Sequence, residues 1–171
     1  KAVVIFSLAA DCADNIDSLA QFQLLRSTWE RQGVNFWGID SSHEDRVEDV
    51  RQIDQLYGLD LPILLDETQL VAENLGLSHA GQIVVIEPSR FQVLFRGSLI
   101  EGLEQNLFDS GLNTVLKASV ELDLDSLNGT LRTNESGCEL DFPSLRKHSS
   151  KVPDYTETIA PILIARCLAC H

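Results

Sequence analysis

The feature that most constrains the fold of this chain is a series of short apolar runs separated by helix-like and turn-like stretches. The first run, "AVVIFSL" at residues 2–8, is rich in β-branched side chains and is too short for a typical helix, which indicates a strand covered on both faces. The run "VNFWGID" at residues 34–40 has the same character. Two such strands predict a sheet packed between other elements.

The segment between these strands has the spacing of an amphipathic helix. Phe22, Leu25 and Trp29 recur at helical intervals. Asp14 before them is a suitable N-cap, and Gly33 after them is a suitable C-terminal cap. We therefore expect a helix between Asp14 and Gly33.

A second helix is predicted to begin at Ser42 and to end at Gly58. Its charged residues would face water, and its apolar residues share one face. That face consists of Val47, Val50, Ile53 and Tyr57.

The next stretch adds a short strand at 61–66, a short helix at 67–76, and two strands at 82–88 and 91–97 joined by the tight turn "PSR". Strands joined so closely form an antiparallel hairpin. The complete order of elements predicts an α/β domain with a mixed central sheet and helices on both faces.

Residues 1–117 resemble the thioredoxin fold. The resemblance is carried by "VVIF", by Cys12 six positions beyond Phe6, by "GVNFWGID", "LPILLD" and "ENLGL", and by the hairpin that ends at Gly97. The match is to the redoxin branch, which includes peroxiredoxin-related proteins of the AhpC/TSA type. It implies a reactive thiol at Cys12, where the first strand meets the first helix and where backbone amides and the helix dipole lower the pKa of a thiol.

Cys12 lacks the sequence partners that such a thiol has in those families. A thioredoxin pair would place a second cysteine at position 15, which is Asn15, and the peroxiredoxin pattern would place a threonine at position 9, which is Ala9. Ala80 and Gly81 stand where thioredoxin-like proteins carry a cis-proline that faces the thiol.

The acidic neighbours Asp11 and Asp14 would also oppose ionisation of the thiol. A redox-active Cys12 and a structural or vestigial Cys12 both remain open at this point. His79 is interpreted as a hydrogen-bonded loop histidine rather than as a catalyst.

The C-terminal sequence "RCLACH" contains a C-x-x-C-H motif made by Cys167, Cys170 and His171. Thiols three residues apart on a helix reach the two vinyl groups of one porphyrin, and the adjacent histidine becomes the axial ligand of the iron. We therefore expect covalent haem c at these three residues. A thioredoxin-type dithiol, half of a zinc site and coincidence are the competing interpretations.

Two further elements lie between the redoxin-like part and this motif: "TNESGC", from Thr133 to Cys138, and "APIL" at residues 160–163. A redoxin domain that runs through such elements into a cytochrome resembles a group of bacterial multidomain redox proteins. This implies that the chain continues beyond His171 into cytochrome c and copper monooxygenase-like modules. Haem attachment of this type takes place outside the bacterial cytoplasm, where disulfides also persist, so the expected compartment is the periplasm.

The expected organisation has four parts. They are a redoxin domain at 1–117 that closes with a helix at 103–117, a hairpin extension carrying Cys138 at 118–142, a polar linker at 143–158, and the first helix of a truncated cytochrome c domain at 159–171. Within the extension, residues 122–133 are expected to form two short strands, because Asn128-Gly129 suits a two-residue hairpin turn.

Charge and hydropathy exclude two classes of partner. The chain has 13 Lys and Arg residues against 26 Asp and Glu residues, a net charge of -13, which repels phosphate backbones and anionic lipid headgroups, so no nucleic acid is expected. The longest apolar runs, 2–10 and 159–165, are far shorter than the ~20 residues that span a bilayer. The chain starts at Lys1 without an export signal, and we expect that a preceding segment was cut away.

Two functions fit these features. In the first, the protein is a redox enzyme in which Cys12 reduces a peroxide or exchanges disulfides with a protein partner, Cys138 is the resolving thiol, and electrons pass to redox partner proteins and the haem. In the second, it is a non-catalytic module that positions a downstream cytochrome or oxidase. A pKa of the Cys12 thiol well below ~8.5 would favour the first.

The cysteine count suggests one pairing. With Cys167 and Cys170 committed to haem, Cys12 and Cys138 are left over in an oxidising compartment. We predict that they are partners, either as a disulfide or as attacking and resolving thiols, with residues 119–140 lying over the Cys12 region. A disulfide requires their Cα atoms to lie within about 7 Å of each other.

Overall fold

A computed structural model of the chain describes residues 2–12, 15–104, 131–133, 136–143, 145–146, 159–161 and 164. The chain forms two compact units, Lys1–Asp141 and Phe142–His171. In the second unit, the amide of Arg146 donates a hydrogen bond to the carbonyl of Phe142, and residues 160–161 and 164 are helical. The predicted haem residues and most of the predicted linker lie outside the described residues.

The first unit is built on a mixed six-stranded sheet with the strand order β3-β2-β1-β4-β5-β6. Its first three strands are mutually parallel, β4 is antiparallel to β1 and β5 to β4, and β6 pairs parallel to β5. The strands are β1 Val3–Leu8, β2 Asn35–Asp40, β3 Ile63–Leu65, β4 Gln82–Glu87, β5 Gln92–Ser98 and β6 Leu131–Arg132.

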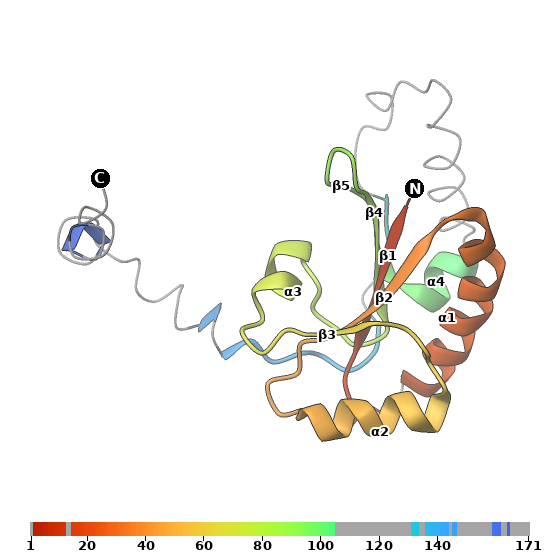
Figure 1. The fold of residues 1–171 in the computed structure, drawn as a ribbon, viewed down its shortest axis with the longest axis horizontal. Coiled ribbons are helices and arrows are strands. Elements are labelled where there is room, and N and C mark those ends of the chain that lie inside the picture. Colours follow the sequence, from red (N-terminus) through yellow and green to blue (C-terminus); the bar gives the residue numbers. More distant parts are fainter. Residues whose placement is uncertain are drawn as a thin grey trace. The chain divides into compact units, whose positions relative to one another are not determined.

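Helices lie on both faces of this sheet, as the sequence predicts (Figure 1). They are α1 Asn15–Trp29, followed by a 3-10 turn at Glu30–Gln32, α2 Val47–Tyr57, α3 Leu70–Leu75 and α4 Leu99–Glu104. Right-handed connections from β1 to β2 and from β2 to β3 place α1 and α2 on one face, where α4 joins them. The helix α3 lies on the opposite face, on the return from β3 to β4.

The core fills the space between the sheet and α1, α2 and α4. The rings of Phe6 in β1 and Phe22 in α1 stack with their centroids 4.6 Å apart. Phe36 in β2 meets Phe22 edge-on at 5.6 Å. Ile53 of α2 and Leu99 of α4 belong to the same buried cluster. The apolar period of the first predicted helix therefore identified the face that anchors the sheet.

The second predicted helix begins later than expected. It starts at Val47 rather than at Ser42, because the chain is still extended at Arg46, the N-cap residue, with φ -111° and ψ 163°. The helix begins where Asp49 accepts a hydrogen bond from the amide of Arg46 at 2.9 Å. Tyr57, predicted on the buried face, is 37% exposed.

Three other boundaries differ from the predictions or pass beyond the described residues. The predicted helix at 67–76 begins only at Leu70, because Gln69 adopts a left-handed backbone with φ 61°. The helix predicted at 103–117 begins already at Leu99, and residues 105–117 lie outside the described part. Of the predicted hairpin at 122–133, only the end is described, and there β6 pairs with β5.

Candidate functional site

The candidate site lies at the edge of the sheet where the parallel strands β1, β2 and β3 end. Because β4 runs antiparallel to β1, its first residues lie at the same edge, and the amide of Gly81 donates to the Ser7 carbonyl at 2.9 Å. Three loops therefore meet there: 9–12, 41–46 and 78–81. Polar groups at the carboxyl ends of parallel strands are commonly brought together in this way.

Cys12 occupies the first of these loops, between β1 and α1, where the sequence predicts it. Its side chain is only 5% exposed. The loop is held by a hydrogen bond from the Cys12 amide to the Ala9 carbonyl at 3.4 Å. The amide of Ala10 also donates to the carboxylate of Asp45 at 2.6 Å, which ties the Cys12 loop to the loop after β2.

Cys12 and Cys138 form a disulfide, with their Cα atoms 5.8 Å apart and a sequence separation of 126. The pairing predicted from the cysteine count is therefore present, and of its two predicted forms the structure contains the bonded one. It differs from a C-x-x-C redox pair because the second cysteine arrives from a distant segment.

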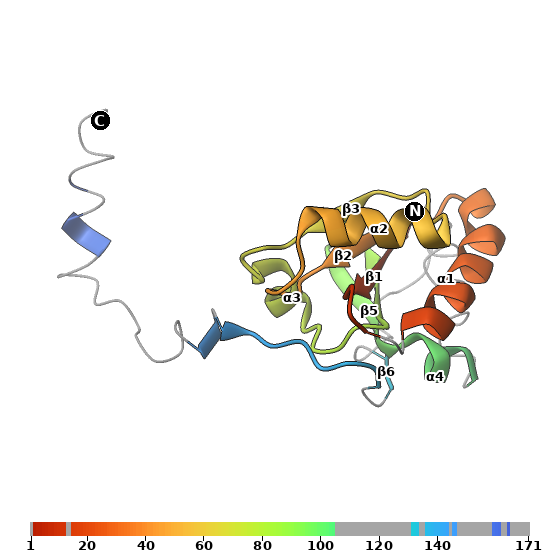
Figure 2. The same cartoon turned by 90° about the horizontal axis from the view of Figure 1, so that it is seen from below.

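That segment, residues 136–141, is called the arm below. It lies antiparallel to the loop before β4, where His79 and Glu139 form an isolated bridge. The amide of Ala80 donates to the Cys138 carbonyl at 2.8 Å, and the amide of Leu140 donates to the Ser78 carbonyl at 2.8 Å. In both overall views the arm, drawn in light blue, runs beside the chain that leaves α3 (Figure 1 and Figure 2). The arm thus adds a short strand-like segment beside Cys12.

Gly137 allows the arm to approach this closely. Its φ of 109° favours glycine, and a Cβ at this position would collide with the carbonyl oxygen of Ala80. On the receiving side, the Gln82 side chain accepts hydrogen bonds from the amides of Ser78 and His79 at 2.8 and 3.0 Å. The loop is therefore fixed in shape where the arm pairs with it.

The far end of the arm is held by a buried side chain. The amide nitrogen of Gln69 donates to the carbonyls of Ser41 and Asp141 at 2.9 and 2.6 Å. The Nε2 atom of His43 lies 4.0 Å from a carboxylate oxygen of Asp141. Gln69 therefore connects the arm to the loop after β2.

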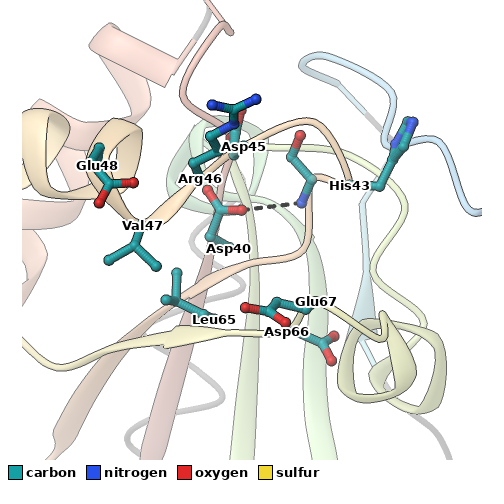
Figure 3. A pocket seen from close by; sticks show the side chains of 10 residues that line it. Asp40, His43, Asp45, Arg46, Val47, Glu48, Leu65, Asp66 and Glu67 are labelled. Atoms are coloured by element: carbon teal, nitrogen blue, oxygen red, sulfur yellow. Dashed lines mark hydrogen bonds between the residues drawn. The ribbon is translucent and has the colours of Figure 1, made fainter.

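An acidic cavity of about 440 Å³ adjoins this loop. Figure 3 shows Asp40, Asp45, Asp66 and Glu67 around it, with Asp40 accepting a hydrogen bond from the backbone of Ser42. Asp40 is 4% exposed, and no N–H or O–H group of the described residues donates to its Oδ2 atom. The cavity therefore contains a buried carboxyl with one oxygen that lacks a donor among these residues.

The pKa of Asp40 is raised to about 8. Burial is the largest cause, followed by the charge of Asp45 and a hydrogen bond between the two carboxyl groups, while the Ser42 amide lowers the pKa and Asp11 raises it. A protonated Asp40 can share its proton with Asp45. Since Asp45 also binds the Ala10 amide, the carboxyl pair is one hydrogen bond away from the Cys12 loop.

The described part of the chain contains neither a metal-binding cluster nor a membrane-spanning helix. Within those residues, no group of three or more His, Cys, Asp or Glu side chains is arranged to hold a metal ion. The predicted haem residues Cys167, Cys170 and His171 lie outside them. In the same described ranges, no helix has the length and apolar character to cross a membrane.

The sequence matches no protein-family model and no curated protein. Solved structures do resemble it. A hypothetical protein from Sinorhizobium meliloti aligns with 81% of this chain and 78% of its own chain, with a TM-score of 0.62 and 19% identity. A putative thioredoxin from Neisseria meningitidis aligns with 66% of this chain and 75% of its own, with a TM-score of 0.56 and 17% identity.

A putative thiol:disulfide interchange protein from Chlorobium tepidum aligns with 67% of this chain and 78% of its own, with a TM-score of 0.54 and 9% identity. This chain has a thioredoxin-like fold. At such identities the likeness extends to the fold alone, so the chemistry has to be argued from the residues of this chain.

Sequence reasoning found both cysteines of the site but missed its supporting residues. Asp40 was assigned only to a strand, and Gln69 and Gln82 carry no motif. Ala80 and Gly81 replace the expected cis-proline, and the described residues contain no cis peptide bond. Gly137 directly before Cys138 was the one available indication that the arm makes a close backbone approach.

Proposed function

We propose that this protein is an extracytoplasmic thiol-disulfide redox protein whose working couple is Cys12 and Cys138. The observation that carries the proposal is the disulfide itself, which joins the loop between β1 and α1 to the arm. A cysteine at this sheet edge of a thioredoxin-like fold is placed to exchange electrons with a protein dithiol. The name of the Chlorobium tepidum neighbour is consistent with this chemistry.

The proposed reaction transfers two electrons. A thiolate of a partner dithiol attacks one sulfur of the Cys12–Cys138 bond, which breaks and leaves the other sulfur as a thiolate that takes up a proton. The second partner thiol then attacks the mixed disulfide. The partner leaves as a disulfide, and Cys12 and Cys138 are left as two thiols. The reverse sequence oxidises a partner.

The acidic surroundings set an expectation for the reduction potential. The carboxylate of Asp45 bonds the Cys12 loop through the Ala10 amide, and Asp11 lies within that loop; negative charge disfavours a neighbouring thiolate. This favours the disulfide over the reduced form. We therefore expect a potential near that of thioredoxin, about -270 mV, rather than that of a strong oxidant.

The decisive experiment is the equilibrium of the oxidised protein with dithiothreitol redox buffers, read by alkylation of Cys12 and Cys138 and mass spectrometry. A potential between about -280 and -180 mV supports exchange with protein dithiols. A potential below about -300 mV, typical of structural disulfides, contradicts it. The docking module would then be the better description, because a permanent disulfide would serve to hold the arm.

A finer proposal concerns peroxide. The Cys12 thiolate would displace an alkoxide or hydroxide from a peroxide and become a sulfenic acid, and Cys138 would condense with it to form the disulfide and water. Protein dithiol exchange is favoured over this reaction, because Ala9 replaces the threonine of the peroxiredoxin pattern. Stoichiometric oxidation of the reduced protein by hydrogen peroxide, at a rate no faster than free cysteine, would rule out a peroxidase role.

We also propose that the couple works together with a haem c held by Cys167, Cys170 and His171, in the periplasm. The spacing of these residues supports it. Co-expression of the exported chain with a cytochrome maturation system should give haem that survives acid-acetone extraction. Replacement of both Cys167 and Cys170 by alanine should abolish this covalent haem, and haem that is fully extracted from the parent protein would refute the attachment.

A further inference from the structure

The contacts of the arm are few in relation to its length. Backbone groups of Cys138, Leu140 and Asp141 hydrogen-bond to other described residues of the domain, and the Asp141 carboxylate lies 4.0 Å from the Nε2 atom of His43. Leu140 is buried at 6% exposure, whereas Glu139 and Asp141 are exposed. Ordering one residue costs about as much free energy as one such hydrogen bond contributes in net terms. The six residues are thus held by a small number of main-chain hydrogen bonds, one exposed ion pair and one buried side chain.

The disulfide therefore supplies the stabilisation that these contacts lack and that keeps the arm docked. It holds Cys138 against Cys12. The donors and acceptors of the two strand-like hydrogen bonds therefore stay close together, at a high effective concentration. We propose that the Cys12–Cys138 bond is a redox-controlled latch: oxidation docks residues 136–141 across the Cys12 edge, and reduction releases them. This rests on the proposed function only in requiring a disulfide that a dithiol can reduce.

The two ends of the arm are suited to such a movement. On one side, Thr133 packs against Gly97, where any Cβ would collide with it, and β6 pairs with β5. On the other side, the second compact unit begins at Phe142. Once released, residues 136–141 would form a free segment that spans at most about 20 Å when fully extended.

Exposure also fixes where reduction begins. Cys12 is 5% exposed as a residue, whereas Cys138 is partly exposed, so we assign the attack of the partner thiolate to Cys138. The new bond forms to Cys138, the electron pair of the broken bond stays on Cys12, and Cys12 takes a proton from solvent. The second partner thiol then frees Cys138 and leaves as a disulfide. The arm is thus the element that carries the mixed disulfide.

Release of the arm exposes backbone groups that hydrogen-bond to it in the docked state. The amide of Ala80 and the carbonyl of Ser78 lose their partners on Cys138 and Leu140, and the Cys12 thiol becomes accessible. Unpaired strand-edge groups of this kind readily pair with another extended chain. The latch therefore keeps a reactive edge covered until electrons arrive.

The test is residue-resolved hydrogen exchange, by NMR, on the full chain before and after reduction with dithiothreitol. Alkylation and mass spectrometry confirm that Cys12 and Cys138 are reduced. The amides of Ala80 and Leu140 should exchange at least about tenfold faster in the reduced protein. Amides of β1 that pair with β4 should keep their rates, because the sheet does not depend on the arm.

Two results would overturn the latch. Unchanged protection at Ala80 and Leu140 would show that the arm stays docked without the disulfide. An equal loss of protection in β1 and β4 would show that the bond holds the whole domain together. The reduction potential is measured separately, so a bond too stable for a partner dithiol defeats the proposed function while the chemically reduced protein still tests the latch.

A variant pair gives an independent measurement without reductant. Cys138→Ser should show the fast exchange of Ala80 and Leu140 under oxidising conditions. The control Glu139→Gln changes an exposed side chain of the same arm and should remain protected. Protection of the arm in Cys138→Ser would contradict the proposal.

Discussion

At the scale of single residues, Asp40 links the acidic cavity to the pH dependence of stability. Its pKa is about 8 in the folded protein against 3.8 in the unfolded chain. Between these values the folded state holds a proton that the unfolded state has lost. The free energy of unfolding therefore falls as the pH rises from about 4 to about 8.

Asp40→Asn should remove this fall in the free energy of unfolding with rising pH. The amide keeps an oxygen for the Ser42 N–H and offers an N–H to Asp45, so no buried charge forms at high pH. The variant should gain at least about 1 kcal/mol over the parent between pH 5 and pH 9, measured by urea unfolding at both pH values. Glu48→Gln, an exposed carboxylate of the same cavity, is the control. A parallel pH dependence in Asp40→Asn and the parent would contradict a buried protonated Asp40.

Gly137 offers a second test at this scale, now of the arm. Gly137→Ala would place a Cβ against the Ala80 carbonyl and should make the Cys12–Cys138 bond at least about tenfold easier to reduce in dithiothreitol buffers. Gly33→Ala is the matched control, because Gly33 also has a positive φ of 88° but nothing within 4 Å of a Cβ. Equal shifts in the reduction equilibrium of the two variants would show that the effect comes from backbone strain and not from the close approach of Gly137 to the Ala80 carbonyl.

At the scale of elements, α1 is the main anchor of the sheet. Phe22 lies between Phe6 and Phe36, so its removal leaves a cavity as well as lost apolar contact. Phe22→Ala should lower the free energy of unfolding by about 3–5 kcal/mol, measured by urea unfolding. Leu24→Ala, on the same helix but 65% exposed, should cost much less. Similar losses in both would mean that helix propensity rather than core packing is responsible.

The sequence predicts these elements well because their apolar periods are strong. The runs at 2–8 and 34–40 became β1 and β2, and the face of Phe22, Leu25 and Trp29 became the buried face of α1. The start of α2 was mispredicted at Ser42, because the chain is still extended at Arg46. Asp40 and Asp45 bind backbone amides of this edge, including one from the distant Ala10. Tertiary hydrogen bonds of this kind leave no local pattern in the sequence.

The candidate site could likewise be predicted from the sequence only in part. The Cys12–Cys138 partnership could be predicted because the C-x-x-C-H motif accounts for the other two of the four cysteines. The cysteine count did not locate the surface that receives Cys138, since Ala80 contributes only backbone groups and Gln82 only fixes their geometry. The arm is specified by main-chain geometry, for which Gly137 is the single sequence indication.

At the scale of the whole molecule, the C-terminal edge of the sheet gathers segments from most of the first unit. The loops after β1 and β2, the loop before β4 and the arm meet there. The disulfide joins two cysteines at a sequence separation of 126, so it restricts nearly the entire unfolded chain of this unit. Its chemistry and its effect on stability are therefore coupled.

The size of that effect depends on whether the arm leaves in the reduced protein. The loop-entropy relation gives about 5 kcal/mol for a separation of 126 residues. That value assumes that the bond adds no order to the folded state. If reduction releases the arm, oxidation must also order six residues in the folded state, which offsets part of the gain.

We expect Cys12→Ala/Cys138→Ala to lose about 2–4 kcal/mol in urea unfolding, with the sheet still folded by circular dichroism. A loss of the full 5 kcal/mol would indicate an arm that stays docked without the bond, and a loss of the fold would assign the disulfide to structure rather than to exchange.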